Sequence, residues 1–170
     1  DTAPRTVTNF MNYVQRGAFN NTFIHRAVRG FVVQGGGYTF RNDKFEAIKE
    51  DPPVVNEFRT SNTRGTIAMA KLGSGPNTAT SQWFFNLSST NASNLDFQNG
   101  GFTVFGRIIN PAGLAAIDQM AATPIYSISA EFDSIPLIRY TPGSNATEAN
   151  FVLIRSITTV ELPPPPSISW

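Results

Sequence analysis

Hydrophobic and polar residues follow a helical period at the start of this chain. Four apolar residues recur at the spacing of one helix face, which predicts an amphipathic helix. Asp1 or Thr2 is placed to cap this helix, and Pro4 stands in its first turn, where a missing N–H costs nothing. Gly17 is placed to end it in the left-handed conformation. The apolar residues of the predicted buried face are Val7, Phe10, Met11 and Val14.

After this segment the pattern changes to short runs of β-branched and aromatic residues separated by Gly, Asn and Pro. Such runs predict strands, and several short strands with Gly-rich turns indicate a barrel or a sandwich. The predicted strands lie near residues 22–28, 31–34, 66–71, 82–87, 103–108 and 151–160.

A second helix is predicted over residues 111–121. Asn110 caps it, Pro111 is its first residue, and Leu114 and Ile117, with Met120 or Ala121, form its buried stripe. Long polar loops cover residues 35–64, 73–81 and 88–101, and loops of this length are usually functional. Pro163–Pro166 favour extended polyproline II, so we expect one domain over residues 1–162 and a tail over residues 163–170.

Composition limits the classes of partner. The chain has 170 residues with a formal net charge of +1, which gives no field that favours nucleic acid or an anionic membrane. No apolar run approaches the ~20 residues of a membrane span. Scarce Lys and abundant Asn, Ser, Thr and Gly favour a periplasmic or extracellular protein over a cytoplasmic one, without excluding the latter. Four glycosylation sequons are expected to be chance matches in so Asn-rich a chain: Asn20, Asn86, Asn91 and Asn145.

The residue types and motifs on which most catalytic sites depend are nearly absent from this chain. Without Cys, disulfides and thiolate chemistry are excluded, and the single His25 excludes His-rich metal sites. A Ser–His–acid triad would need His25, and no Gly-x-Ser-x-Gly elbow is present. The Gly35–Gly37 run lacks the Lys-Ser/Thr end of a phosphate loop. We therefore expect no metal and no cofactor.

Rotation about an X–Pro bond needs no nucleophile, metal or titrating base. Its barrier of ~18–20 kcal/mol comes from amide resonance, and a fixed cationic donor can stabilise the twisted state. Such a site needs one Arg, several aromatic residues and a Gln. Residues 23–37 and 67–87 supply that mixture.

Four motifs in order resemble the cyclophilin family of peptidyl-prolyl cis–trans isomerases. The first is FIHRAVRGFVVQGGG at residues 23–37, and the second is GTIAMAK at residues 65–71. The third is GPNTATSQWFF at residues 75–85. The fourth is Leu95-Asp96 followed by GFTVFGR at residues 101–107, whose wording is similar to the bacterial branch. The match covers roughly residues 1–122.

This resemblance implies an eight-stranded antiparallel barrel capped by two helices, which acts on proline-containing peptides or unfolded proteins. It assigns Arg26 as the electrostatic catalyst and Gln34 as a ligand of the substrate backbone. Ala70 and Lys71 would form the edge that pairs with the bound peptide, with Gln82 nearby. The resemblance also implies an apolar proline pocket, lined by Phe31, Val32, Phe84, Leu95 and Phe102.

Three residues depart from the family pattern. Lys71 stands where many members carry Asn, which affects side-chain preference more than backbone contacts. Phe102 stands where the best-known members have a His, so an apolar wall replaces a polar partner. Asn94 aligns with a Trp of the members that bind cyclosporin tightly, which puts cyclosporin binding in doubt but leaves catalysis untouched.

A fourth departure is the β-hairpin that usually precedes the first helix and is missing from this chain. A barrel without two strands has open edges. The hairpin could be omitted upstream, removed by proteolysis, or replaced by strands from another chain in a homo-oligomer or filament. The chain could accordingly be an isomerase, a structural subunit assembled by strand donation, or a peptide-binding chaperone with negligible turnover.

Other polar residues are given structural roles. His25 is expected to be a structural histidine, and Asn56 and Glu57 to make structural hydrogen bonds. Trp83 should face the core if Gln82 and Phe84 face the site, because successive strand residues alternate.

Overall fold

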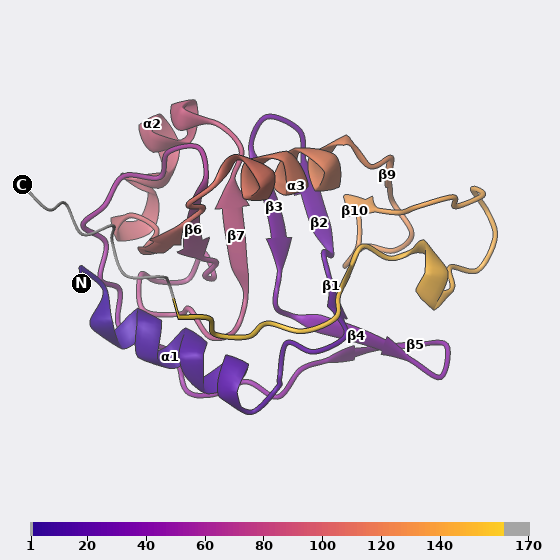
Figure 1. Cartoon of the computed structure of the whole chain (residues 1–170), viewed down its shortest axis with the longest axis horizontal. Helices are drawn as coiled ribbons and strands as arrows, with labels where there is room; N and C mark the ends of the chain where they lie inside the picture. The colour runs from indigo at the N-terminus through magenta and orange to yellow at the C-terminus, as the bar shows by residue number, and fades with distance from the viewer. Residues whose placement is uncertain (1, 162–170) are drawn as a thin grey trace, which may run out of the picture.

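A five-stranded antiparallel sheet lies at the centre of the molecule (Figure 1). The computed structural model describes residues 2–161, so the predicted tail at residues 163–170 lies outside the described residues. The strand order of the central sheet is β2-β3-β7-β6-β8. Its strands are β2 (Arg26–Val28), β3 (Val32–Gly35), β7 (Trp83–Asn86), β6 (Thr66–Met69) and β8 (Val104–Arg107).

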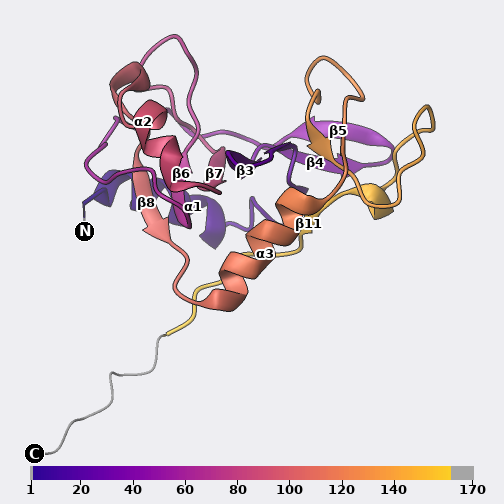
Figure 2. The same ribbon diagram turned by 90° about the horizontal axis from the view of Figure 1, so that it is seen from above.

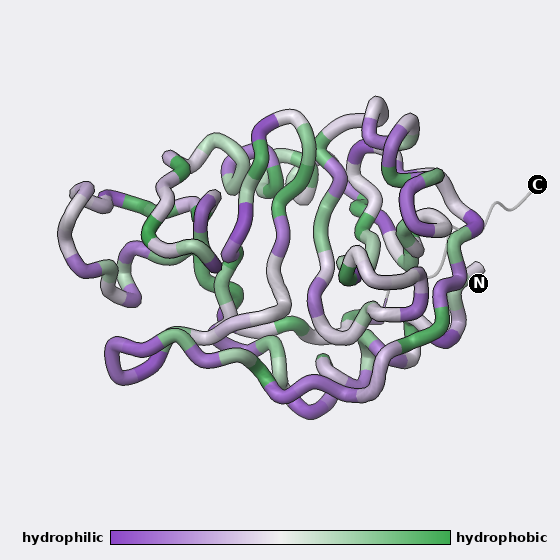
Figure 3. Tube along the Cα trace, turned by 180° about the vertical axis from the view of Figure 1, so that it is seen from behind, coloured by the Kyte–Doolittle hydropathy of each residue, from purple (hydrophilic) through white to green (hydrophobic). Residues whose placement is uncertain are grey.

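A second antiparallel sheet extends to one side, with the order β11-β1-β4-β5. The β4–β5 hairpin of this sheet ends in a hydrophilic tip that projects from the body of the molecule (Figure 3). A short pair, β10 with β9, packs near β2. The strands are β1 (Thr22–Phe23), β4 (Tyr38–Arg41), β5 (Lys44–Ala47), β11 (Leu153–Ile154), β9 (Ile125–Tyr126) and β10 (Ile135–Pro136).

Helices cover the central sheet, and Figure 2 shows α2 and α3 on opposite sides of it. The helices α1 (Pro4–Gln15) and α3 (Pro111–Ala122) confirm the two predicted helices within one or two residues. Three short helical turns occur in the predicted loop at residues 88–101: η1 (Ser89–Asn91), α2 (Ala92–Leu95) and η2 (Gln98–Gly100). A fourth, η3 (Glu148–Asn150), lies outside the predicted loops. The antiparallel β architecture with helices on its faces agrees with the predicted fold class.

Each face of the central sheet buries a separate apolar cluster. Val33 and Trp83 contribute to the larger core, together with Tyr13 of α1 and Ile117 of α3. The neighbouring residues in sequence point the other way because strand side chains alternate. They form a smaller cluster made of Val32, Ala68, Phe84, Leu95 and Val104. The expectation that Trp83 faces the core is confirmed.

Strand boundaries differ from the prediction where pairing partners decide them. The predicted strand at residues 22–28 is divided, because β1 pairs in the second sheet and β2 in the central one. The predicted strand at residues 151–160 shrinks to β11, since the β1 edge offers only two paired positions, Thr22 and Phe23.

The β4–β5 hairpin lies inside the predicted loop at residues 35–64, where no strand was predicted. Its two turn residues, Asn42 and Asp43, have φ values of 49° and 58°. Positive φ at both central positions defines the hairpin turn that Asn and Asp favour. The turn signal was therefore present in the sequence.

The buried face of α1 is more polar than predicted. Val7 and Met11 are only half-buried, whereas Thr6, Asn9 and Tyr13 are buried. Each of these polar groups has a partner: Asn9 Nδ2 donates to the Thr80 carbonyl at 2.8 Å, and the Tyr13 hydroxyl accepts from the Asp51 N–H at 2.6 Å. These hydrogen bonds offset the free-energy cost of burying polar side chains on this face of α1.

The start of α1 is capped by a distant carboxylate. The predicted cap Thr2 is wrong, because Ala3 occupies the N-cap position, and its side chain supplies no hydrogen bond. Asp1, the other predicted cap, lies outside the described residues. Glu57 accepts instead from the Thr6 N–H at 2.8 Å, the Thr6 hydroxyl at 2.9 Å and the Arg5 N–H at 3.3 Å. Burial alone would raise the pKa of Glu57, but these hydrogen bonds outweigh it and lower the pKa.

The neighbouring Asn56 has a similar structural role. Its Nδ2 donates to the carbonyls of Gly100 and Gly101 at 2.8 and 3.1 Å. The predicted structural hydrogen bonds of Asn56 and Glu57 are therefore confirmed.

His25 lies buried between β1 and β2, with 6% of its surface exposed and its ring edge-on to Tyr38. Burial lowers the pKa of His25 from 6.5 to about 4, a contact with Gln82 raises it, and the charge of Arg26 lowers it. A neutral histidine packed in this way agrees with a structural role.

Two of the four glycosylation sequons are buried. Asn86 is 0% exposed and Asn91 is 4% exposed, and both side-chain amides donate hydrogen bonds inside the protein. Neither amide can carry a glycan in the folded state, whereas Asn20 and Asn145 lie on the surface.

Replacing Glu57 with Ala should destabilise the fold. The variant leaves the first turn of α1 without an acceptor, and we expect a loss of about 1–2 kcal/mol in the free energy of unfolding. Chemical denaturation measures this loss. The control is Glu46→Ala, an exposed glutamate on β5, and an equal loss in both variants would contradict the capping role.

His25 should make stability fall in acid. Its pKa of about 4 in the folded state lies below the 6.5 of the unfolded chain, so protons bind the unfolded state preferentially. Stability is then fully present above pH 6.5 and lost as the pH falls towards 4, by about 1.4 kcal/mol per unit. His25→Phe should flatten this part of the curve in denaturation measured from pH 7 to pH 4. An unchanged slope would contradict the assignment.

Candidate functional site

A row of paired residues crosses all five strands of the central sheet on its open face. Arg26 on β2 pairs with Gln34 on β3, and Gln34 pairs with Phe84 on β7. Phe84 pairs in turn with Ala68 on β6, and Ala68 with Val104 on β8. Residues directly opposite in an antiparallel sheet project from the same face. The residues of this row are therefore charged or polar on β2 and β3 and apolar on β7, β6 and β8.

This face opens into a hollow of about 220 Å³. Its volume suits one side chain or ring better than a large ligand. All of the predicted site residues line it except Gln82. The hollow also contacts Gln98, an exposed residue of η2 that was not predicted; only its place in the long loop at residues 88–101 marked it. The lining residues are Arg26, Phe31, Val32, Gln34, Ala70, Lys71, Phe84, Leu95, Gln98 and Phe102.

The floor and far wall of the hollow are apolar. Val32 and Phe84 form the floor and Leu95 part of the wall, and each is at most 4% exposed. Half-buried Phe102 stands edge-on to Phe84, with 5.7 Å between the ring centroids. A compact apolar ring would displace water from this surface favourably.

The near wall of the hollow is polar. Among the described residues, the guanidinium of half-buried Arg26 makes no hydrogen bond and no ion pair within 4 Å. Gln34, which pairs with Arg26 across the β2–β3 hairpin, donates from Nε2 to Gln82 Oε1 at 2.9 Å. Five guanidinium donors thus remain available to a ligand beside an apolar surface.

Gln82 lies in an adjoining hollow of about 520 Å³, which shares Gln34, Ala70 and Lys71 with the first. The Ala70 N–H donates to the Gln82 carbonyl at 2.9 Å. Within residues 2–161, the Ala70 carbonyl and the Lys71 N–H make no hydrogen bond. A short backbone edge between the two hollows is therefore free to pair with an extended peptide.

The Lys71 side chain has a role that sequence reasoning missed. Its Nζ donates to the carbonyls of Asn99 and Gly101, both at 2.6 Å, and lies 4.7 Å from the centre of the Phe102 ring. Burial lowers the pKa of this amine. The Lys71 side chain therefore holds the turn before Phe102 in place through hydrogen bonds. The sequence suggested only an altered preference for substrate side chains.

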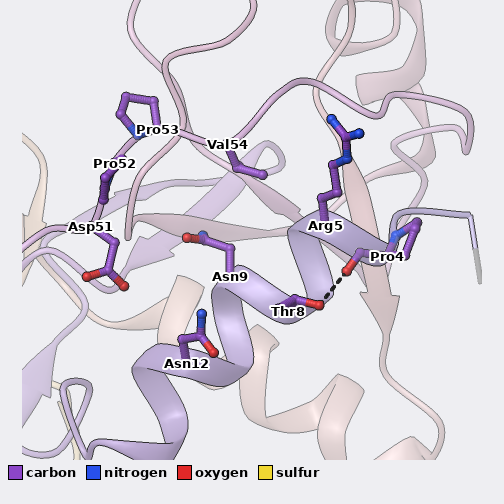
Figure 4. A pocket seen from close by; sticks show the side chains of 9 residues that line it. All are labelled: Pro4, Arg5, Thr8, Asn9, Asn12, Asp51, Pro52, Pro53 and Val54. Carbon is purple, nitrogen blue, oxygen red and sulfur yellow. Dashed lines mark hydrogen bonds between the residues drawn. The ribbon is translucent and has the colours of Figure 1, made fainter.

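A separate groove lies between α1 and residues 51–54 (Figure 4). Two of the polar side chains around it have structural partners. Asn9 binds the Thr80 carbonyl, and Asp51 forms an ion pair with Arg16 at 2.6 Å. None of the predicted site residues faces this groove, so we place the candidate site at the central sheet.

The described residues contain neither a metal-binding cluster nor a membrane-spanning helix. Over residues 2–161, no group of three or more His, Cys, Asp or Glu side chains could hold a metal ion. In the same range, no helix has the length and hydropathy needed to cross a bilayer.

Comparison with known proteins agrees with this geometry. The family model of the cyclophilin type peptidyl-prolyl cis-trans isomerases matches residues 1–140. Peptidyl-prolyl cis-trans isomerase B of Escherichia coli is 39% identical over 125 residues, which cover 71% of this chain and 73% of that protein. A peptidyl-prolyl cis-trans isomerase of Acinetobacter baylyi is 38% identical, over 72% of this chain and 63% of that protein.

The fold is similar to that of a Cryptosporidium parvum cyclophilin type isomerase, crystallised in the presence of the dipeptide Ala-Pro. The TM-score is 0.63 at 22% identity, over 95% of this chain and 88% of that structure. The family match, the bacterial relatives and the shared fold lead to one conclusion: this chain belongs to the family of cyclophilin-type peptidyl-prolyl cis–trans isomerases.

Proposed function

We propose that this chain accelerates rotation about X–Pro bonds and that Arg26 is its catalytic residue. Family membership supports the isomerase activity. The observation that carries the residue assignment is the guanidinium of half-buried Arg26, which has no protein partner among the described residues and borders an apolar hollow. No cofactor is needed, because the reaction makes and breaks no covalent bond.

The proposed mechanism depends on the electronic change that accompanies rotation. In the planar amide, the prolyl nitrogen shares its lone pair with the carbonyl, and this resonance creates the barrier of ~18–20 kcal/mol. In the twisted state the nitrogen becomes pyramidal and regains the lone pair. Arg26 would donate to that lone pair and thereby stabilise the twisted state more than either planar isomer.

The surrounding residues would bind the segments on the two sides of the X–Pro bond at separate places. The hollow, with Val32 and Phe84 in its floor and Leu95 in its wall, would bind the proline ring. Gln34 and the free backbone edge at Ala70 and Lys71 would hold the preceding segment. Suitable substrates are exposed X–Pro bonds in loops or unfolded proteins, where an extended backbone can reach this edge. The expected periplasmic or extracellular location stays a prediction.

Arg26→Ala should lower the catalysed rate while the protein still binds a proline peptide. Losing one preorganised donor to the transition state typically costs about 10²–10³-fold in rate. NMR exchange spectroscopy on a short Ala-Pro peptide measures the rate and the affinity together.

The matched control is Arg29→Ala, an exposed arginine at the turn of the same β2–β3 hairpin. It removes the same charge outside the hollow and should leave the rate unchanged. Equal rates for wild type and Arg26→Ala would overturn the mechanism. Peptide binding by the wild type with no enhanced exchange would indicate a chaperone instead.

A second candidate role is assembly through strand donation. Within residues 2–161, β8 is paired only with β6, so its other side is an open edge. Nearby, Ile109 is 66% exposed and Val7 and Met11 of α1 are half-buried. An open edge beside apolar side chains favours pairing with an added strand. That strand could come from another copy in an oligomer or filament, with the isomerase hollow left open.

Assembly should depend on protein concentration. Size-exclusion chromatography with light scattering should detect dimers or larger species that increase in proportion as concentration rises. A monomer at every concentration would contradict strand donation between copies of this chain. This outcome would leave the isomerase proposal intact, because the hollow lies within one copy.

A further inference from the structure

Three buried asparagines form a continuous hydrogen-bonded chain behind the candidate site. Asn62 and Asn86 are 0% exposed, and Asn91 is 4% exposed. Asn91 Nδ2 donates to Asn86 Oδ1 at 2.7 Å, and Asn86 Nδ2 donates to Asn62 Oδ1 at 3.2 Å. Asn62 Nδ2 then donates to Asp96 Oδ1 at 3.0 Å. The chain thus links residue 62 to three positions of the segment 86–96.

The ends of this asparagine chain hold the walls of the hollow. Asn91 Nδ2 donates to the Phe31 carbonyl at 2.7 Å, and Asn62 Nδ2 donates to the Phe102 carbonyl at 3.0 Å. Asp96, which directly follows Leu95, accepts from the Asn62 N–H at 2.8 Å. Phe31, Leu95 and Phe102 are therefore connected through the asparagines.

The three wall residues have less support from strand ladders than the rest of the hollow, although the Leu87 N–H donates to the Phe31 carbonyl and the Phe102 N–H to the Leu95 carbonyl, both at 2.9 Å. Val32, Gln34 and Phe84 belong to β3 and β7, where ladder hydrogen bonds fix the backbone. The other three lie outside the strands: Phe31 before β3, Leu95 at the end of α2 and Phe102 after η2. Binding sites keep their shape when loop-borne side chains are held by hydrogen bonds from behind.

The amide side chains of the asparagine chain also indicate that these residues position their neighbours, beyond contributing to stability. Apolar residues of similar size can replace a buried polar pair at little cost in stability. A connected set of amides instead fixes the orientation of each member, because every donor requires its own acceptor. Asp96 adds a charged anchor: burial raises its pKa, but hydrogen bonds from Ser61 and Asn62 outweigh burial and lower the pKa.

We propose that Asn62, Asn86 and Asn91 are positioning residues of the isomerase, which act through Phe31, Leu95 and Phe102. They hold the walls of the hollow at the separation that fits a proline ring. This inference rests on the proposed function, but it concerns binding of the ring rather than donation by Arg26. Its signature is a weaker affinity for proline peptides with a nearly unchanged catalysed rate at saturation.

The test compares Asn91→Ala with a control that also removes a buried hydrogen bond. Thr22→Val removes the bond from Thr22 Oγ1 to the Phe19 carbonyl at 2.8 Å, on β1 outside the hollow. Both variants should lose stability in denaturation experiments, and Asn91→Ala should lose more because the Asn91 amide makes two hydrogen bonds. We expect only Asn91→Ala to raise the dissociation constant for an Ala-Pro peptide, by about tenfold, with the saturated exchange rate within about threefold of wild type.

Additional readouts keep the test decisive. NMR signals of the Phe31 and Phe102 rings should shift or broaden in Asn91→Ala and not in Thr22→Val. If Asn91→Ala does not fold, Asn91→Ser, which keeps one donor, should show a smaller change in the same direction. A folded Asn91 variant with wild-type affinity, or an equal loss of affinity in Thr22→Val, would overturn the proposal.

The outcome is separable from that of the proposed mechanism. Peptide affinity can be measured without turnover, so it reports on the asparagine chain even if Arg26→Ala proves fully active. Conversely, an intact affinity in the Asn91 variants would leave the role of Arg26 unaffected.

Discussion

The alternation of side chains along the central strands is the constraint on which both the core and the candidate site depend. Val33 and Trp83 enter the core, while their neighbours Val32 and Phe84 face the hollow. A register slip of one residue would exchange the two sets and destroy both surfaces at once. Four cross-strand pairs, from Arg26 to Val104, keep the polar and apolar ends of the site in order. The site is thus a consequence of strand pairing, and loops only complete its walls.

Local patterns predicted the two long helices and the central strands because periodicity, caps and β-branched runs are encoded in neighbouring residues. Predictions of features that depend on residues distant in the sequence were wrong or missing. The acceptor for α1 is Glu57, which no cap rule based on Asp1 or Thr2 could find. The apolar run after Phe151 has strand propensity, but the sheet offers it only a two-residue edge. The β4–β5 hairpin was a different failure, since Asn42-Asp43 is a readable turn signal inside a polar loop.

The candidate site was predictable to the extent that its residues occur in motifs. Nine of the ten predicted residues line one hollow, and Gln82 lines the adjoining one. Gln98 lacked a motif, and the Lys71 side chain gave no sign that it fastens the turn at residues 99–101. The buried asparagines were equally hidden: Asn86 and Asn91 drew notice only as glycosylation sequons expected to be chance matches, and Asn62 drew none. Only the fold places these amides behind the same wall.

The distance in sequence between α1 and its cap has a consequence for the order of folding. Thr6 and Glu57 are 51 residues apart, so α1 is synthesised well before its acceptor exists. At about 5–20 residues per second, that interval is roughly 3–10 s. An isolated helix of twelve residues is marginal in water, so α1 has little stability of its own during this time. Its docking must await long-range contacts, which makes the first helix of the chain one of the later elements to become fixed.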